Sequence, residues 1–273
     1  MKLNISKIVI LGYITTMLLG FAACGEYQAI LKSKDPELKY QKALSYFNDK
    51  QYVKAQTLLD EITTYYRGTD RSQDVLIYLS RSYMGQKDYS SAAEYYQAYI
   101  RNYPKGRYIV EAQFQVGHCY YLDAPDARLD QTETKKAIEF FTKFVELYPD
   151  NPYAEQAYKE MNELYDKLAH KEYLSAKLYY NLGTYLGNNY LSAEIVAKNA
   201  LEDYPTNKHQ EELNWIILQA KYQQLLNSVN SKREERARET DDEYYSFITQ
   251  YPASKHRAAA DKIHKEIQKI LEN

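Results

Sequence analysis

The chain has 273 residues, enough for one large domain or two small ones. Its 31 tyrosines against nine glycines and seven prolines favour packed helices over a turn-rich β-protein. The formal net charge is -2 with both signs interspersed. This argues against nucleic acid as a partner, because a nucleic-acid-binding protein should carry a basic excess on one face.

The N-terminus has the composition of a processed targeting segment. Lys2 and Lys7 form a short positive region, and the apolar run from Ile8 to Leu19 is too short to span a bilayer as a mature helix. The run ends in small residues before Cys24 and so resembles a bacterial lipoprotein signal. That resemblance implies a signal peptide over residues 1–23 and acylation of Cys24, which would anchor the chain without spanning the membrane. An ordinary cleavable signal with an incidental cysteine is the alternative.

The residues after Cys24 indicate to which membrane the lipoprotein would be delivered. Gly25 stands where an aspartate would retain some lipoproteins in the inner membrane, so the resemblance favours delivery to the outer membrane. Only Glu26 adds negative charge nearby, and we expect no export to the cell surface. We expect residues 24–34 to be a lipid-anchored tether, with the folded part facing the periplasm.

A period of 37 residues organises the folded part. Asp35 is placed to cap the first helix, and Pro36 suits its first position. Small residues recur at the period, each with a tyrosine three positions later: Ala43 and Tyr46, Ser80 and Tyr83, Gly117 and Tyr120. A fixed period of this length indicates a solenoid of helix pairs, in which small residues let helices cross closely. The pattern resembles the tetratricopeptide repeat.

The second helix of each pair carries its own signature. An alanine lies 11 residues before a tyrosine, and a proline that stops the helix follows in most copies. The pairs are Ala55 and Tyr66, Ala92 and Tyr103, Ala137 and Tyr148, and Ala193 and Tyr204, while Thr240 replaces the alanine in the copy that ends at Tyr251. We therefore predict an all-α solenoid of about five tetratricopeptide-like helix pairs with a C-terminal capping helix.

The spacing divides the chain into two parts. Repeats one to three occupy residues 35–150, and repeats four and five with the capping helix occupy residues 151–273. In the third repeat, residues 123–131 lengthen the turn, either as a solvated loop or as a partner contact. The C-terminal helices are expected over residues 153–170, 171–186, 208–229, 231–251 and 255–271, with one more around Ala193.

The chain offers little catalytic chemistry. Its histidines, which are His118, His170, His209, His256 and His264, form no metal-ligand pair within one helix, and no Gly-rich phosphate loop occurs. We expect no enzyme, no metal and no cofactor. Cys119 lies in an apolar run, where a buried structural thiol is expected rather than a nucleophile. The charge run over residues 232–239 is expected to be a solvated helix face.

A solenoid of helix pairs offers a groove lined by its first helices. By tetratricopeptide register the candidate groove residues are Tyr40, Leu44, Phe47, Asp74, Ile77, Arg81, Met84, Glu111, Phe114, His118 and Tyr121. We expect Tyr40, Leu44, Ile77 and Phe114 to belong to the core. The better candidates for exposed groove residues, suited to an extended peptide, are Arg81, Met84, His118 and Tyr121.

A lipoprotein signal joined to these repeats resembles the BamD family of the outer-membrane β-barrel assembly machinery. The resemblance spans roughly residues 35–271 and is tightest over residues 148–153 and 166–173, followed by Ala176, Tyr179 and Tyr180. It implies a scaffold that binds the POTRA domains of a BamA-like barrel protein through its C-terminal half and unfolded outer-membrane proteins in its N-terminal groove, with accessory lipoproteins as further partners. The partner-contact candidates that it implies are Asp166, Lys167, His170, Lys171, Tyr173 and Tyr180, together with residues 190–205.

Two other classes of protein remain open. One is a different periplasmic repeat adaptor, acting at the cell wall or in division, which would need no barrel partner. The other is a glycan-binding outer-membrane lipoprotein, against which a single tryptophan and nine glycines argue. Substrate identity, accessory partners and oligomeric state are not encoded in any pattern that we recognise.

Overall fold

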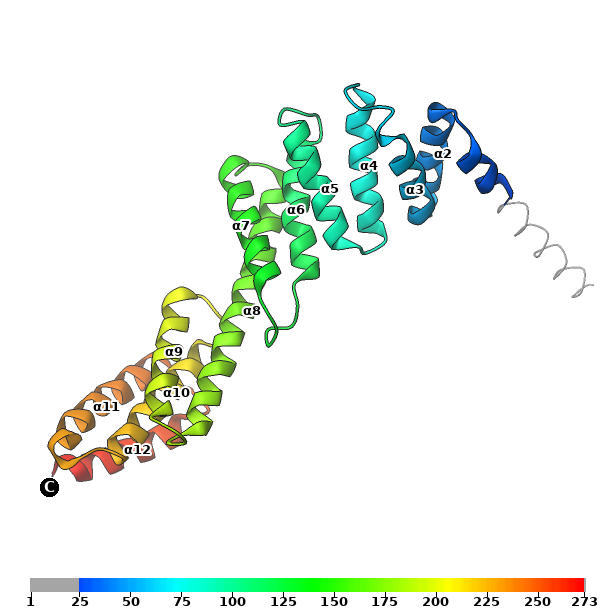
Figure 1. Ribbon diagram of the computed structural model, residues 1–273. Helices are drawn as coiled ribbons and strands as arrows, with labels where there is room; N and C mark the ends of the chain where they lie inside the picture. Colours follow the sequence, from blue (N-terminus) through cyan, green and yellow to red (C-terminus); the bar gives the residue numbers. More distant parts are fainter. Residues whose placement is uncertain (1–24, 273) are drawn as a thin grey trace, which may run out of the picture. The chain divides into compact units, whose positions relative to one another are not determined.

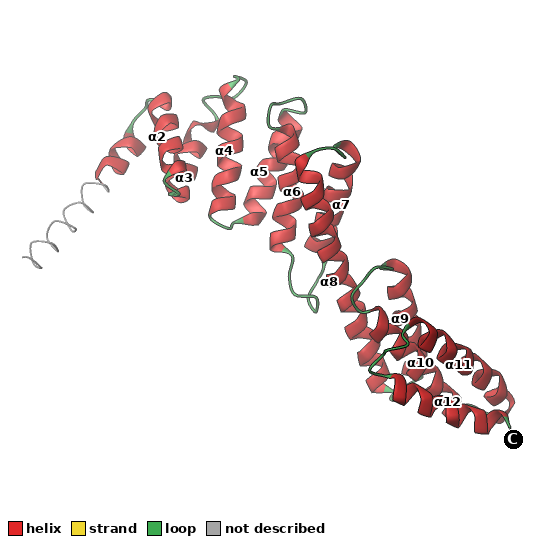
Figure 2. Cartoon of the chain, turned by 180° about the vertical axis from the view of Figure 1, so that it is seen from behind, coloured by secondary structure: helices red, strands yellow, loops and turns green. Residues whose placement is uncertain are grey.

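The computed structural model describes residues 25–272, and all regular secondary structure in that part is helical (Figures 1 and 2). The predicted signal peptide and the predicted acylation site, Cys24, lie outside the described residues. Residues 25–32 are helical, and the helices that follow are α2 (Pro36–Asn48), α3 (Tyr52–Thr63), α4 (Arg71–Gly85), α5 (Tyr89–Asn102), α6 (Ile109–Asp123), α7 (Thr132–Leu147), α8 (Pro152–Leu182), α9 (Asn189–Asp203), α10 (Gln210–Leu226), α11 (Asn230–Gln250) and α12 (Arg257–Leu271). The predicted all-α fold of consecutive helix pairs is confirmed.

Local chemistry sets the helix ends. Asp35 accepts hydrogen bonds from the backbone N–H groups of Glu37 and Leu38 at 2.9 and 3.2 Å, and Pro36 follows it as predicted. Asp88 and Asn188 cap α5 and α9 in the same way. These side chains satisfy backbone donors that a helix start leaves without an intrahelical acceptor.

The helices divide into two compact units. Unit 1 comprises residues 25–123 and 139–157, and unit 2 comprises residues 124–138 and 158–272. In unit 1 each helix from α2 to α6 packs against the next along the chain, and α2 also contacts α4 (Figure 1). The repeated small residues lie where these helices cross: Ala43, Ala55 and Ala92 are fully buried. A Cβ on Gly117 would lie 2.7 Å from Cδ1 of Phe141, so α6 and α7 are too close there for any larger residue.

The helix α8, whose first residues belong to unit 1 and the rest to unit 2, departs from prediction. We expected separate helices over residues 153–170 and 171–186, but α8 runs without a break from Pro152 to Leu182. No glycine or proline lies between these ends, so nothing interrupts the backbone hydrogen bonds. The helix ends at Gly183, whose φ of +57° suits glycine at a helix C-terminus.

The remaining helices of unit 2 pack in sequence from α9 to α12. Ala193, Ala197 and Ala200 on α9 are fully buried against α10, which again lets two helices approach closely. The last helix, α12, buries Ala260 and Ile267 and leaves its lysines in solvent, as expected of a capping helix.

A planar stack joins successive repeats and was not predicted. In four of the repeats, the fifth residue after the tyrosine near the end of the second helix packs over an aromatic side chain of the preceding first helix; the second repeat, which has Ile77 at the first-helix position, is the exception. In unit 1, Arg71 lies 4.4 Å over the Tyr40 ring and Tyr153 stacks on Phe114 at 4.6 Å and 9°. In unit 2, His209 stacks on Tyr173 at 5.0 Å and 3°, and His256 stacks on Trp215 at 4.8 Å and 8°.

The segment expected to be a tether is also helical. Residues 25–32 pack on α2 and α3, with Ile30 4% exposed in the same core as Leu58 and Leu59. Apolar burial of this kind fixes a helix on its neighbours. Residues 25–32 are therefore packed on the first repeat.

Candidate functional site

The first helices of unit 1 carry the groove candidates, and several of these residues are core. Tyr40, Ile77 and Phe114 are at most 5% exposed, as expected, and Leu44 is partly buried against the first core cluster. Tyr40 lies edge-on to Tyr66, and Phe114 packs against Phe141 and Phe144. These residues hold the repeats together and leave little of their surface to a ligand.

The charged groove candidates on α4 form ion pairs with α6 and with the turn that precedes it. Arg81 donates from Nε and Nη2 to the two carboxylate oxygens of Glu111 at 2.7 and 2.6 Å, and the two side chains are 28% and 20% exposed. Asp74 accepts a hydrogen bond from the Tyr108 hydroxyl at 2.8 Å and pairs with Arg107 at 2.5 Å. Burial and this carboxylate raise the pKa of Tyr108 to about 12. A bidentate guanidinium–carboxylate pair fixes both side chains geometrically.

The remaining groove candidates, Phe47, Met84, His118 and Tyr121, are partly exposed. Phe47 lies edge-on to Tyr78 with ring centroids 5.2 Å apart. The Met84 sulfur lies 3.2 Å from the thiol of Cys119. His118 stacks on Phe114 at 5.7 Å and on Tyr121 at 6.0 Å. These contacts explain why the four side chains are only partly exposed.

Cys119 itself is fully buried, as expected. Burial raises the pKa of its thiol to about 12, so the thiolate is scarce at neutral pH. Since the thiolate is the reactive species, this cysteine is a packing residue of α6.

The partner-contact candidates on α8 bind other parts of unit 2. Lys167 Nζ donates to the backbone oxygen of Ala124 at 3.0 Å, and Lys171 Nζ donates to that of Leu129 at 2.7 Å. These two lysines hold the inserted loop against α8. Inside the loop, Gln131 donates to the backbone oxygens of Asp126 and Leu129. The insertion is therefore an ordered loop fastened from two sides.

The other α8 candidates contact the turn before α10. Asp166 accepts from the backbone N–H of Lys208 at 3.1 Å and pairs with its ammonium group at 2.7 Å. His170 Nδ1 lies 3.0 Å from His209 Nε2, and Tyr173 stacks on the same His209 ring. Tyr180 lies further along α8 and packs edge-on to Tyr190 of α9, with its pKa raised by burial. The six candidates thus have structural partners within unit 2.

Sequence reasoning missed the histidine pair. It considered only histidines spaced within one helix, whereas His170 and His209 are 39 residues apart and meet where α8 passes the start of α10. Burial first, and the neighbouring His170 second, lower the pKa of His209. Within residues 25–272 no three histidine, cysteine or carboxylate side chains gather in a way that could hold a metal ion.

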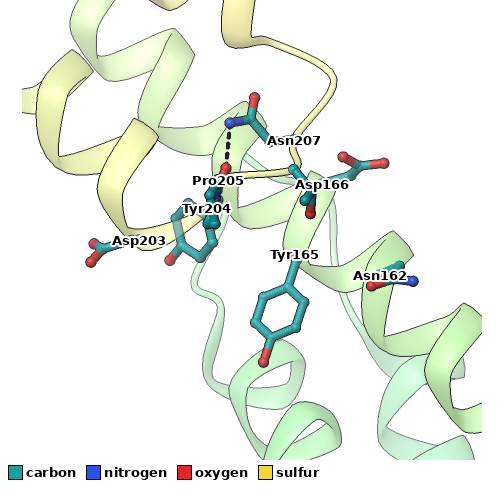
Figure 3. A pocket seen from close by; sticks show the side chains of 8 residues that line it. Asn162, Tyr165, Asp166, Asp203, Tyr204, Pro205 and Asn207 are labelled. Carbon is teal, nitrogen blue, oxygen red and sulfur yellow. Dashed lines mark hydrogen bonds between the residues drawn. The ribbon is translucent and has the colours of Figure 1, made fainter.

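A cleft of about 620 Å³ lies beside this junction (Figure 3). Its walls are α8, through Asn162, Tyr165 and Asp166, and the end of α9 with the turn that follows, through residues 203–207. Figure 3 shows the Asn207 side chain turned back to the backbone oxygen of Tyr204, a hydrogen bond of 2.6 Å. The turn is thereby held in shape by its own side chains, and the cleft has a fixed wall.

The α8–α9 hairpin concentrates exposed hydrophobic side chains. These are Leu178, Tyr179, Leu182, Tyr185, Leu186, Leu191 and Ile195, all between 36% and 91% exposed. The turn between the helices has positive φ at Gly183, Leu186 and Gly187, and Leu186, at φ +55°, is the most exposed of the set. A non-glycine residue in this conformation is uncommon. We call these seven side chains the hairpin surface.

The comparison with family models identifies the chain. The model described as YfiO, outer membrane lipoprotein, matches residues 32–188. The chain belongs to this family. This model represents the BamD family domain. Its match covers the groove candidates and all six partner-contact candidates. It also covers the hairpin surface up to Leu186, but not Leu191 and Ile195. No curated protein matches the chain.

The proteins of this family are outer-membrane lipoproteins. In the part of the chain from residue 25 to residue 272, no helix combines the length and the apolar character needed to cross a bilayer.

Proposed function

We propose that this lipoprotein is a non-catalytic, periplasm-facing scaffold of the outer-membrane β-barrel assembly machinery. Unit 2 binds the POTRA domains of a BamA-like barrel protein, and the first helices of unit 1 receive segments of unfolded outer-membrane proteins. Family membership supports the first statement. The single structural observation that carries the proposal is the hairpin surface, because exposed apolar side chains gathered on one hairpin are typical of a protein-binding site.

The surroundings of the hairpin surface also support partner binding. Gly183 and Tyr190 hold the turn: a Cβ at Gly183 would lie 2.9 Å from the Tyr190 hydroxyl. Tyr185 and Leu186 are 67% and 91% exposed at the tip of this held turn. Large apolar side chains on an ordered support lose little conformational entropy on binding.

Aromatic rings, and not unpaired charged side chains, make the groove in unit 1 suitable for an extended peptide. Phe47, His118 and Tyr121 each keep a partly exposed ring. The Arg81–Glu111 pair lies on the same set of first helices and supplies a polar group for a peptide backbone.

Co-purification from gently solubilised membranes tests the proposal. Leu178→Asp combined with Leu186→Asn removes apolar surface, and asparagine tolerates the left-handed backbone at position 186. We expect at least a tenfold loss of a co-purified BamA-like barrel. Val229→Asp changes a side chain that is 67% exposed on unit 2 but outside the hairpin, and is the matched control. Absence of any barrel protein from the unaltered complex would favour a different periplasmic adaptor.

A photo-crosslinking amino acid in place of Tyr121 tests the groove. We expect it to capture unfolded outer-membrane protein at least fivefold more than the same group in place of Tyr65, which is 67% exposed at the end of a second helix. Equal capture at the two positions would contradict the groove assignment. Depletion of the protein should, in addition, lower the amount of folded porin in the outer membrane.

A further inference from the structure

The described residues start at Gly25, already in a helix that continues to Lys32, and Cys24, the proposed site of acylation, directly precedes them in the sequence. Ile30 is buried in the core of the first repeat, and Tyr27 and Leu31 pack against the same core. A lipid on Cys24 would therefore be joined to the first repeat without a flexible linker.

The contacts of this helix fix its direction. Glu26 pairs with Lys42 at 2.5 Å, and the Tyr27 ring lies 5.6 Å from Tyr46, edge-on. At the other end, Lys39 donates to the backbone oxygen of Leu31 at 3.0 Å. The helix thus runs antiparallel to α2, and its first residue lies at the end of the repeat where α2 turns into α3.

The chemistry at that end of the repeat suits a lipid headgroup region. Lys54 lies over the rings of Tyr27 and Tyr46, at 5.4 and 5.2 Å. Val53 is 61% exposed although it is apolar, and Lys50 is exposed beside it. Tyrosines and lysines around an apolar residue are typical of membrane interfaces, where the rings and the long cationic side chains lie among the headgroups. Asp49 is the one acidic residue between positions 48 and 54.

We propose that the α2–α3 turn of the first repeat, residues 49–54, rests on the lipid surface that holds the acyl chains. This inference depends on the proposed lipid anchor. Tyr27 is three residues after Cys24 in the chain, so the acylated residue cannot lie more than about 11 Å from it even if the chain between them is fully extended. The first repeat is therefore held at the headgroups with its turn toward the bilayer, and the opposite end of the hairpin points away from it.

Fluorescence quenching in liposomes tests the orientation. Val53→Cys in the full acylated chain is labelled with an environment-sensitive fluorophore, in liposomes that contain nitroxide-headgroup lipid. Cys119 is buried with a raised thiol pKa and does not compete for the label. The matched control is Tyr65→Cys, which lies about 18 Å away along the same helix pair. We expect at least threefold stronger quenching at position 53, and equal quenching at the two positions would overturn the inference.

A linker variant separates the anchor from the fold. Twenty Gly and Ser residues inserted between Cys24 and Gly25 give a mean reach of about 25 Å. We expect quenching at position 53 to fall to the level of the control, while the protein stays on the membrane. Unchanged quenching would show that the anchor does not place the turn, and would contradict the proposal.

The mass of the mature protein shows whether a failed test concerns the lipid anchor or only the orientation of the turn. An unacylated mature chain would overturn the proposed anchor and this inference together. An acylated chain with weak quenching at position 53 would overturn this inference alone and leave the proposed scaffold function standing.

Discussion

Unit 1 and unit 2 place a planar side chain at the same point of the repeat, but with different chemistry. In unit 1 this position holds Arg71 over Tyr40 and Tyr153 on Phe114. In unit 2 it holds His209 on Tyr173 and His256 on Trp215. A guanidinium stays charged at all accessible pH values, whereas an imidazole ordinarily titrates near pH 6.5. Unit 2 thus has imidazoles where unit 1 has a guanidinium or a phenol, and the stack at His209, whose pKa is lowered by burial, is sensitive to pH.

Charged side chains are used in two ways, and each unit contains both: Lys39 of unit 1 also binds the Leu31 backbone oxygen, and Lys221 of unit 2 also pairs with Glu243. Unit 1 pairs Arg81 with Glu111 across two first helices. Unit 2 uses Lys167 and Lys171 to hold backbone oxygens of an inserted loop. Pairing of side chains fixes one helix on another, while binding of backbone oxygens fixes a segment that has no helix of its own. Four changes, from the largest expected effect to the smallest, test this comparison.

Phe114→Ala should cause the largest loss. Phe114 is 1% exposed and contacts Phe141, Phe144 and Tyr153, so truncation leaves a cavity among large rings. We expect a loss of about 3–5 kcal/mol in the free energy of unfolding, measured by urea denaturation. Leu122→Ala, at a site that is 38% exposed on the same helix, is the control and should cost much less. Similar losses for both would show that Phe114 is not part of the core.

Arg81→Met should have the next largest effect, confined to unit 1. It leaves the Glu111 carboxylate half-buried without its bidentate partner. We expect the free energy of unfolding to fall by about 1–2 kcal/mol. A double-mutant cycle with Glu111→Gln should give a coupling energy of about 1 kcal/mol. Strictly additive losses in the cycle would show that the pair contributes nothing beyond its separate side chains.

Acidification should weaken unit 2 selectively. The pKa of His209 is lowered in the folded protein, so the unfolded chain binds more protons below pH 6.5. Stability is therefore complete above about pH 6.5 and falls as pH decreases toward the folded pKa. The groups that face His209 are His170, Asp166, Glu212, Lys208 and Tyr173.

The single tryptophan provides the measurement. Trp215 lies in unit 2, and its fluorescence reports unfolding of that unit between pH 7.5 and 5.5. His209→Phe keeps a planar ring on Tyr173 and removes the titrating group, so it should flatten the pH dependence. An equally steep dependence in that variant would place the titration elsewhere.

Lys171→Met should have the smallest effect, on local stability alone. It removes the hydrogen bond to the Leu129 backbone oxygen and leaves that of Lys167 in place. If the free energy of local opening falls by about 1 kcal/mol, amide hydrogens in the loop should exchange roughly fivefold faster. Hydrogen exchange at residues 126–131 measures it, with Lys177→Met, further along α8, as the control. Unchanged exchange would show that the loop is held by its internal bonds to Gln131.

The sequence by itself determined the repeat. The 37-residue period, the small residues at helix crossings and the Asp35 cap all act through local or nearest-neighbour geometry, which a linear pattern records. The core assignment of Tyr40, Ile77 and Phe114 followed from the same register.

Only the tertiary structure decided the rest. The pairing of His170 with His209, the lysines that hold the inserted loop and the docked helix over residues 25–32 join segments that no fixed spacing relates. The unbroken α8 is a different case, because the sequence between Pro152 and Leu182 contains no glycine or proline that would stop a helix. Exposure of the hairpin surface was invisible in the sequence. An apolar residue at helical spacing is normally core, and only the positions of neighbouring helices reveal which ones remain uncovered.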